Sequence, residues 1–187
     1  MNKKGFTLLE LLIVIAILAI LATVTFVVLN PAQLLAQARD SQRISELASI
    51  RTAISLYLAT ATSTTLDGGG GVCQTNYWRT SVASTSLSGT ALTPSTNQTV
   101  GGSGWIPVNL TMVSGGSPLA KWPIDPRNTT SPYGYSYGCD AANLTFELNA
   151  KMESAAYRNG GTNDVESTDG GNNVNIYETG TDPSLDL

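Results

Sequence analysis

The sequence predicts an α+β fold in which a long N-terminal helix, part transmembrane and part amphipathic, packs on a small antiparallel β-sheet. Three observations lead to this prediction. Residues 6–29 form an uninterrupted apolar run, residues 32–61 carry apolar side chains at helical spacing, and short segments beyond residue 105 alternate apolar with polar residues. An amphipathic helix followed by half-buried strands is typical of α+β domains.

The apolar run at residues 6–29 is long enough to cross a membrane. It contains neither Gly nor Pro and includes a single carboxylate, Glu10. As a helix it would extend about 36 Å, more than the hydrocarbon core of a bilayer. Lys3 and Lys4 precede it, which predicts a cytoplasmic N-terminus. Gly5 lies before the run, whereas the cleavage site of a secretory signal peptide follows its apolar region.

The N-terminus resembles that of type IV prepilins and the related pseudopilins, through the motif Lys4-Gly5-Phe6-Thr7-Leu8-Leu9-Glu10. The resemblance implies that prepilin peptidase cuts between Gly5 and Phe6 and methylates the new amine of Phe6. It also implies that an inner-membrane assembly platform builds the chain into a homo-oligomeric helical filament. The Phe6 ammonium of one subunit would then compensate Glu10 of a neighbour in an apolar bundle.

Glu10 also has a plainer interpretation. A carboxylate near the membrane face can reach the headgroups, or it can interact with the positive N-terminus of its own helix. This interpretation leaves the Gly5-Phe6 junction unexplained.

A second helix is expected beyond Pro31. Proline removes a hydrogen bond to the preceding turn, so we expect a kink near residues 27–31. Apolar residues from Ala32 to Ala61 recur at helical spacing and would face the sheet. We expect the charged residues between them to form a solvated, salt-bridged flank, with contacts to neighbouring subunits as the alternative: Arg39, Asp40, Arg43, Glu46 and Arg51.

A four-glycine run at residues 68–71 ends the helical pattern and suggests four parts. These are a leader (residues 1–5), a transmembrane helix (6–30), an amphipathic helix (31–66) and a Gly-linked β-sheet domain (67–187). No Lys-Ser or Lys-Thr follows the glycines, which argues against a phosphate-binding loop. Residues 72–103 are rich in Ser, Thr, Gly and Asn and predict a long surface connection with short elements at most.

Three segments predict β-strands, at residues 106–112, 133–137 and 144–150, the last two joined as a hairpin. Alternating tyrosines in the second segment favour aromatic packing between strands, with an adhesive surface as the alternative. The stretch Trp122-Pro123-Ile124-Asp125-Pro126-Arg127-Asn128, followed by Tyr133-Gly134-Tyr135, resembles the proline-rich loop and strand of the major pseudopilins of type II secretion.

Cys73 and Cys139 are the only cysteines. In a domain exposed to an oxidising exterior they can form a disulfide, which would stabilise the long connection by about 2–4 kcal/mol. Two free buried thiols are the alternative. Their spacing fits neither a zinc site nor thioredoxin-like chemistry, and the chain has no His.

Acidic residues gather late in the chain and offer one candidate metal site. Nine of the 14 lie from Asp140 onward, and we expect them to form a solvated, self-repelling face. Asp164, Glu166 and Asp169, with nearby backbone carbonyls, could bind Ca²⁺, which prefers oxygen ligands. The pseudopilins that the chain resembles often carry calcium in a comparable C-terminal loop. A disordered acidic tail is the alternative.

Composition argues for an exported structural protein and against an enzyme. Without His, a Ser-His or Cys-His nucleophile is excluded. The net charge of −4, which loss of the leader makes more negative, disfavours binding to nucleic acid. We expect a pilin that is stored in the inner membrane, in contact with lipid, and then polymerised into an extracellular filament at the cell surface. A type II secretion major pseudopilin is one alternative, and a non-polymerising, membrane-anchored surface binding module is the other.

Overall fold

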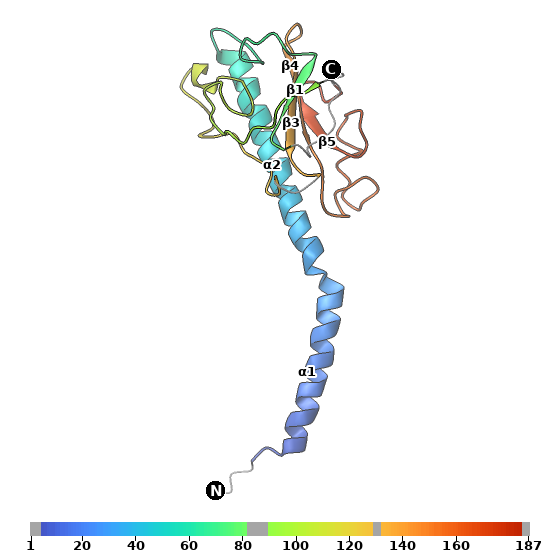
Figure 1. Cartoon of the computed structure of the whole chain (residues 1–187). Coiled ribbons are helices and arrows are strands. Elements are labelled where there is room, and N and C mark those ends of the chain that lie inside the picture. The colour runs from blue at the N-terminus through green and yellow to red at the C-terminus, as the bar shows by residue number, and fades with distance from the viewer. Residues whose placement is uncertain (1–4, 82–89, 129–131, 185–187) are drawn as a thin grey trace.

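The protein consists of a long helical stalk topped by a head built on a β-sheet (Figure 1). The computed structural model describes residues 5–81, 90–128 and 132–184. A long N-terminal helix packed on a mostly antiparallel sheet confirms the predicted α+β fold. The elements are α1 (Leu8–Leu29), α2 (Pro31–Thr60), β1 (Asn76–Arg79), β2 (Thr90–Ala91), a 3₁₀ helix η1 (Leu110–Met112), β3 (Tyr135–Asp140), β4 (Thr145–Ala150) and β5 (Tyr177–Gly180).

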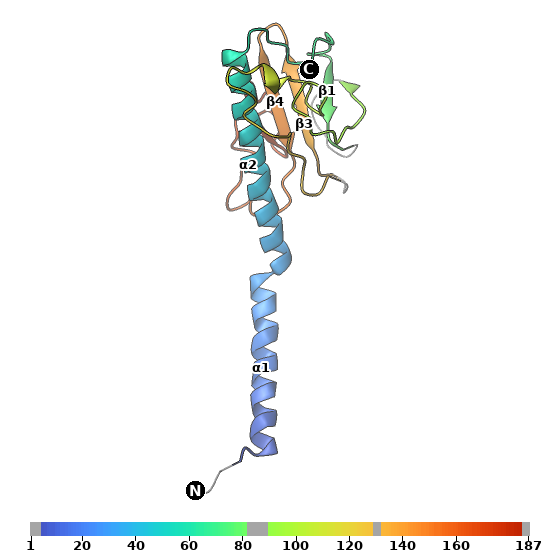
Figure 2. The ribbon, with the colours of Figure 1, turned by 90° about the vertical axis from the view of Figure 1, so that its left-hand side faces the viewer.

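The two long helices are separated by Asn30, where the ribbon is visibly offset (Figure 2). Asn30 adopts a left-handed conformation with φ 38°, which Asn tolerates better than most residues. Its backbone carbonyl accepts a hydrogen bond from the Gln33 amide at 2.9 Å. Pro31 occupies the first position of α2, where a backbone N–H would have no acceptor within the helix, so proline causes no loss there. The break therefore falls within the predicted residues 27–31.

The sheet has the strand order β2-β1-β3-β4-β5. β3 and β4 pair antiparallel from Tyr135 opposite Ala150 to Asp140 opposite Thr145, and these are the two strands predicted as a hairpin. β5 pairs antiparallel with β4, β1 antiparallel with β3, and β2 parallel with β1. The short strands β1 and β2 lie within the predicted long connection.

The strand predicted at residues 106–112 is wrong. Residues 110–112 form η1, and the Asn109 side chain caps it by accepting a hydrogen bond from the Thr111 amide at 3.1 Å. Ile106, Val108 and Leu110 are all completely buried. Their burial arises from an irregular segment that fills the core, and not from one face of a strand.

α2 covers one face of the sheet, and the core lies between them. Its buried side chains include Leu47, Ile50 and Ile54, which share the core with Tyr135 and Tyr137 of β3. The ring of Tyr137 lies 5.6 Å from that of Trp78 and 6.3 Å from that of Phe146. The aromatic-packing interpretation is therefore confirmed for these tyrosines, and the adhesive alternative is wrong because both are fully buried.

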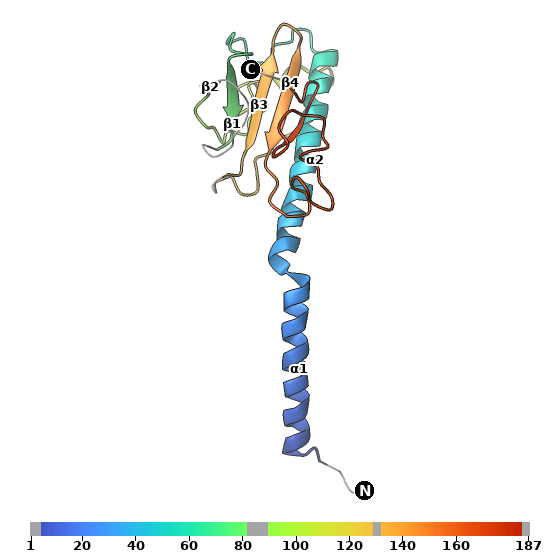
Figure 3. The ribbon, with the colours of Figure 1, turned by 90° about the vertical axis from the view of Figure 1, so that its right-hand side faces the viewer.

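The C-terminal segment between β4 and β5 forms ordered loops beside the sheet (Figure 3). The predicted solvated acidic face is wrong in part, because Glu147, Glu166 and Glu178 are at most 3% exposed. Backbone amides donate hydrogen bonds to two of these buried carboxylates, those of Glu166 and Glu178. The Glu166 carboxylate, for example, accepts hydrogen bonds from the amides of Met152 at 2.9 Å and Asn159 at 3.1 Å. The alternative of a disordered tail is also wrong for the described residues.

Candidate functional site

The cleavage junction predicted from the sequence lies at the free end of the stalk. The Phe6 side chain is 86% exposed. A Cβ added to Gly5 would meet nothing within 4 Å, so packing within the chain does not require glycine at this position. The leader residues Lys3 and Lys4 lie outside the described residues. A small residue at position 5 thus has no explanation within the folded chain.

α1 exposes an apolar surface on all sides. An 18-residue window of the N-terminal helix has a mean hydropathy of 3.2, and none of that window is buried in the protein. The 22 residues of α1 extend about 33 Å, enough to cross the hydrocarbon core of a bilayer. Exposure of so much apolar surface to water would be strongly unfavourable. α1 is therefore suited to a membrane or to packing against other apolar helices.

The polar side chains of α1 are satisfied within the helix itself. Thr23 donates its hydroxyl hydrogen bond to the Ala19 carbonyl at 2.9 Å, and Thr25 donates to the Leu21 carbonyl at 2.8 Å. Such bonds leave no hydroxyl that needs water. The helix can consequently sit in an apolar environment without help from other segments.

Glu10 and Thr7 form a reciprocal cap at the start of α1. The Glu10 carboxylate accepts hydrogen bonds from the Thr7 amide and the Thr7 hydroxyl, both at 2.8 Å. The Thr7 hydroxyl oxygen accepts in turn from the Glu10 amide at 3.2 Å. This capping box matches the interpretation in which Glu10 interacts with its own helix terminus. Sequence reasoning named Thr7 within the motif but overlooked its capping role, although Thr-x-x-Glu before an apolar run is a recognised capping signal.

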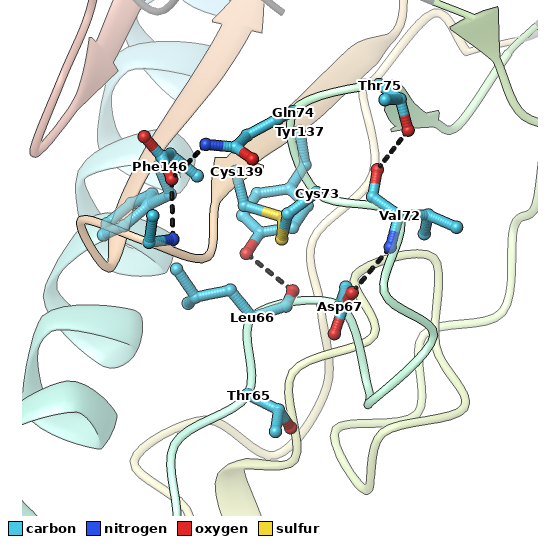
Figure 4. Close-up of a disulfide and its surroundings, with 12 residues drawn as sticks. Thr65, Leu66, Asp67, Val72, Cys73, Gln74, Thr75, Tyr137, Cys139 and Phe146 are labelled. Atoms are coloured by element: carbon cyan, nitrogen blue, oxygen red, sulfur yellow. Dashed lines mark hydrogen bonds between the residues drawn. A yellow bond between two sulfur atoms is a disulfide. The ribbon is translucent and has the colours of Figure 1, made fainter.

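Cys73 and Cys139 are joined by a disulfide that links the loop after α2 to β3 (Figure 4). Next to it, the Asp67 carboxylate accepts hydrogen bonds from the amides of Gly69 at 2.9 Å and Val72 at 2.8 Å. The Tyr137 hydroxyl donates to the Leu66 carbonyl at 2.9 Å. The disulfide and these bonds together hold residues 66–73 against the end of the sheet.

A buried charge cluster ties α2 to two distant loops. Arg43 donates to both oxygens of Asp125, at 2.7 and 3.0 Å, and to Asp40 at 2.7 Å. All three side chains are completely buried. Burial alone would lower the pKa of Arg43, but its hydrogen bonds to Asp125 and Asp40 raise it overall. The predicted solvated flank is thus wrong for Asp40 and Arg43.

Glu153 extends this cluster toward the surface. It accepts hydrogen bonds from Arg39 at 2.6 and 2.8 Å and from Arg127 at 2.6 Å. The Arg39 hydrogen bonds, with a further contribution from Arg127 and against the effect of burial, lower the pKa of Glu153 to about 2. Asp40 also accepts from the backbone amides of Glu153 at 2.8 Å and Ser154 at 2.7 Å.

Charge in the cluster is balanced, because three arginines face three carboxylates. Two of these arginines lie over the Tyr133 ring, Arg43 at 4.9 Å and Arg127 at 4.8 Å from its centre. Sequence reasoning named Arg43 and, in a separate stretch, Asp125, but it missed their pairing across 82 residues. No local signal could have paired them. The cluster comprises Arg39, Asp40, Arg43, Asp125, Arg127 and Glu153.

The calcium ligands predicted from the sequence are not brought together. Asp164 accepts from the Gly160 and Ser167 amides, Glu166 is bound as described above, and Asp169 accepts from the Gly171 amide at 2.9 Å. Among the residues that the structure describes, no three acidic, Cys or His side chains are placed to hold a metal ion together. Each of the three carboxylates instead organises its own turn of the loop.

Comparison with known proteins supports the N-terminal features. Residues 1–26 match the prokaryotic N-terminal methylation motif. No curated protein and no solved structure matches the chain. With an exposed apolar helix behind a Gly-Phe junction, the chain thus carries the class III signal of type IV pilins, and this motif supports its place in the pilin and pseudopilin superfamily.

Proposed function

We propose that this chain is the structural subunit of a type IV pilus-like filament and that α1 forms the filament core. The observation that supports it most is the exposed, predominantly apolar α1, most of which lies within the matched methylation motif. In this proposal prepilin peptidase removes residues 1–5, and the mature subunit waits in the inner membrane. An assembly platform then transfers it into a homo-oligomeric filament outside the cell.

Assembly exchanges one apolar environment for another. Lipid surrounds α1 before assembly, and the α1 helices of neighbouring subunits surround it afterwards. Hydroxyl groups do not oppose this transfer, because Thr23 and Thr25 bond within their own helix. The new ammonium of Phe6 is the group that requires compensation, since a buried unpaired charge is costly. We assign this role to Glu10 of a neighbouring subunit.

The cap between Thr7 and Glu10 fits the stage before assembly. In a single chain the Glu10 carboxylate has hydrogen-bond donors within its own first turn. In this proposal the carboxylate is ionised when the ammonium of a neighbour reaches it, and the two charges then compensate each other. Under this proposal the cap makes Glu10 tolerable in the membrane, and the Phe6 ammonium makes it useful in the filament.

The type II secretion pseudopilin remains the alternative within the same superfamily. Its support is the Trp-Pro-Ile-Asp-Pro-Arg-Asn segment at residues 122–128. In the structure this segment supplies Asp125 and Arg127 to the charge cluster. A pilus subunit and a secretion pseudopilin would both be processed by prepilin peptidase and would both polymerise. A membrane-anchored binding module that never polymerises shares neither.

The decisive experiment compares filament yield in Glu10 variants in the native cell. Glu10→Gln keeps the oxygen that caps Thr7 but removes the charge, whereas Glu10→Ala removes both. We expect both variants to insert normally and to lose sheared filaments at least tenfold, because the Phe6 ammonium is left uncompensated. Electron microscopy and mass spectrometry of sheared fractions, beside immunoblots of membranes, provide the measurement.

Thr23→Val is the matched control. It has nearly the same volume and lies on the same helix, but it removes only a hydroxyl that bonds to its own backbone. We expect normal filament yield from it. Normal yield from Glu10→Gln would show that the ammonium–carboxylate pairing is wrong. Absence of filaments from wild-type cells that display the protein would favour the binding module.

A further inference from the structure

The head contains three turns that share one chemically labile sequence. Each turn begins with Asp or Asn followed by two glycines, and they start at Asp67, Asn159 and Asp169. The first glycine of each turn has a left-handed backbone, with φ of 67°, 77° and 91° respectively, which glycine adopts without strain. The sequence contains no other Asn-Gly or Asp-Gly pair. These pairs are prone to spontaneous rearrangement, because glycine has no side chain to shield its own amide nitrogen.

In this rearrangement the glycine nitrogen attacks the side chain of the residue before it. At Asn159 a bond would form between the Gly160 nitrogen and Asn159 Cγ, the nitrogen would lose its proton, and ammonia would leave. Water then opens the cyclic imide and gives aspartate or isoaspartate at position 159. Apart from water, the reaction needs only a mobile side chain and an available amide.

Two of the three turns hold the side chain that would be attacked. The Asp67 carboxylate accepts hydrogen bonds from two backbone amides, at 2.9 and 2.8 Å. The Asp169 carboxylate also accepts from two backbone amides, at 2.9 and 2.6 Å. Rotation of either carboxylate into a position for attack would break these bonds, so both aspartates are restrained.

The turn at Asn159 is restrained at the attacking amide instead. The Asn159 side chain is exposed and forms no hydrogen bond with the residues that the structure describes. The Gly160 amide, in contrast, donates to Asp164 Oδ2 at 2.8 Å. An aspartate is ionised at neutral pH, and a hydrogen bond to an ionised acceptor is a strong one. Because attack requires the amide to give up its proton, this bond opposes the reaction.

Asp164 is itself fixed within the loop. The Ser167 amide donates to its Oδ1 at 3.0 Å, and the Ser167 hydroxyl donates to its Oδ2 at 2.6 Å. On the other side of the labile pair, the Asn159 amide donates to the buried Glu166 carboxylate at 3.1 Å. The amides of both labile residues are thus tied to the segment at residues 164–167.

We propose that Asn159 is a latent deamidation site and that Asp164 suppresses the reaction by holding the Gly160 amide. This gives Asp164 a protective role that does not depend on the proposed function of the chain. The suppressed reaction would damage the loop. A new carboxylate at position 159 would lie in the same turn as Asp164 and Glu166, and isoaspartate would lengthen the backbone by one carbon.

The turn has little room for a longer backbone. A Cβ at Gly161 would fall 2.3 Å from the Ala156 carbonyl oxygen, so the chain already passes very close to itself there. The same loop contacts the first turns of α2, where the Gln33 side chain accepts a hydrogen bond from the Ala155 amide at 3.1 Å. Deamidation would therefore loosen the loop from α2.

The test measures deamidation at Asn159 in the full chain in detergent micelles. Wild-type protein and Asp164→Ala are incubated in mildly alkaline buffer, and peptide mapping by mass spectrometry follows the conversion of amide to acid. We expect Asp164→Ala to deamidate about tenfold to hundredfold faster, the factor that corresponds to loss of a hydrogen bond to a charged acceptor. Asp164→Asn keeps a neutral acceptor and the side-chain shape, so its rate should be intermediate even if Asp164→Ala disturbs the loop.

Two controls separate protection of the amide from other effects. Ser167→Ala removes one donor to Asp164 but keeps the Gly160 bond, and it should deamidate at nearly the wild-type rate. In concentrated urea, wild-type protein and Asp164→Ala should deamidate at one common rate, faster than the folded wild type. Hydrogen exchange should speed up at the Gly160 amide of folded Asp164→Ala while the amides of β4 keep their protection.

Three outcomes would overturn the proposal. Equal rates in folded wild-type protein and Asp164→Ala would show that Asp164 does not protect the site. A folded wild type that deamidates as fast as the unfolded chain would show that the site is not protected at all. A faster rate in Asp164→Ala together with lost protection in β4 would attribute the effect to unfolding.

Discussion

α1 and α2 follow one another with a single residue between them, yet they depend on their surroundings in opposite ways. α1 is exposed on all sides, and its described polar groups bond within the helix. α2 buries one apolar stripe against the sheet and places Asp40 and Arg43 in the interior, where they bind each other and residues of distant loops. α1 can therefore move from one apolar environment to another, whereas α2 cannot separate from the sheet and loops of the head without exposing its apolar stripe and its buried charges.

Asn30 makes this division possible. It ends α1 and caps α2, so the two helices have separate hydrogen-bond networks. A change in the environment of α1 therefore need not disturb the core beneath α2. If the two helices are independent, a change at the start of the stalk should leave the head folded, and a change in the head should leave membrane insertion normal.

Gly5→Val should block maturation completely while leaving the fold unchanged. The structure provides no contact for a side chain at position 5, so any loss must arise outside the folded chain. N-terminal sequencing and intact mass should find a mature wild-type chain that begins at N-methylated Phe6 and a variant that begins upstream. A wild-type chain that begins at Met1, or well beyond Phe6, would contradict the prediction.

Arg43→Met should destabilise the head by about 3–5 kcal/mol, because it leaves two buried carboxylates without their counter-charge. Arg51→Met on the exposed side of the same helix is the control and should change stability by less than about 0.5 kcal/mol. Urea unfolding in micelles, followed by Trp fluorescence, measures the effect, while membrane insertion through α1 should remain normal. Equal stabilities of the two variants would show that the cluster contributes little.

Reduction of the Cys73–Cys139 bond should destabilise the head by about 2–4 kcal/mol, because the bond closes a loop between residues 66 apart. Dithiothreitol should lower the urea midpoint of wild-type protein and have no effect on a variant with both cysteines changed to Ser. Non-reducing peptide mapping of exported protein should recover the linked peptides. Two free thiols in that map would contradict the prediction.

Stability of the head should fall in acid through Glu153. Its folded pKa of about 2 lies below the ordinary value of 4.5, so its contribution is fully present above pH 4.5 and is lost as pH falls toward 2. Glu153→Gln should flatten this part of the pH profile, measured as the thermal midpoint between pH 2 and 6. Asp182→Asn should keep the wild-type slope, and an unchanged slope in Glu153→Gln would refute the assignment.

The sequence by itself determined the stalk, because the requirements of α1 are local. Hydropathy fixed its extent, Pro31 fixed the break, and the motif around Gly5 and Phe6 is contiguous. Even the Thr7–Glu10 cap, although overlooked, follows from residues three apart. The same holds for the β3–β4 hairpin, whose strands are neighbours in the chain.

Only the tertiary structure decided the fate of the charged residues in the head. The pattern of α2 could not distinguish the buried Arg43 from the exposed Arg51, because its partner Asp125 lies 82 residues away. Asn149 and Glu178 likewise become neighbours only when β5 joins the sheet. A sequence alone does not show whether a charged side chain is solvated or buried. Burial of a charge is so unfavourable that it requires a partner of opposite charge, and only the fold brings such a partner close.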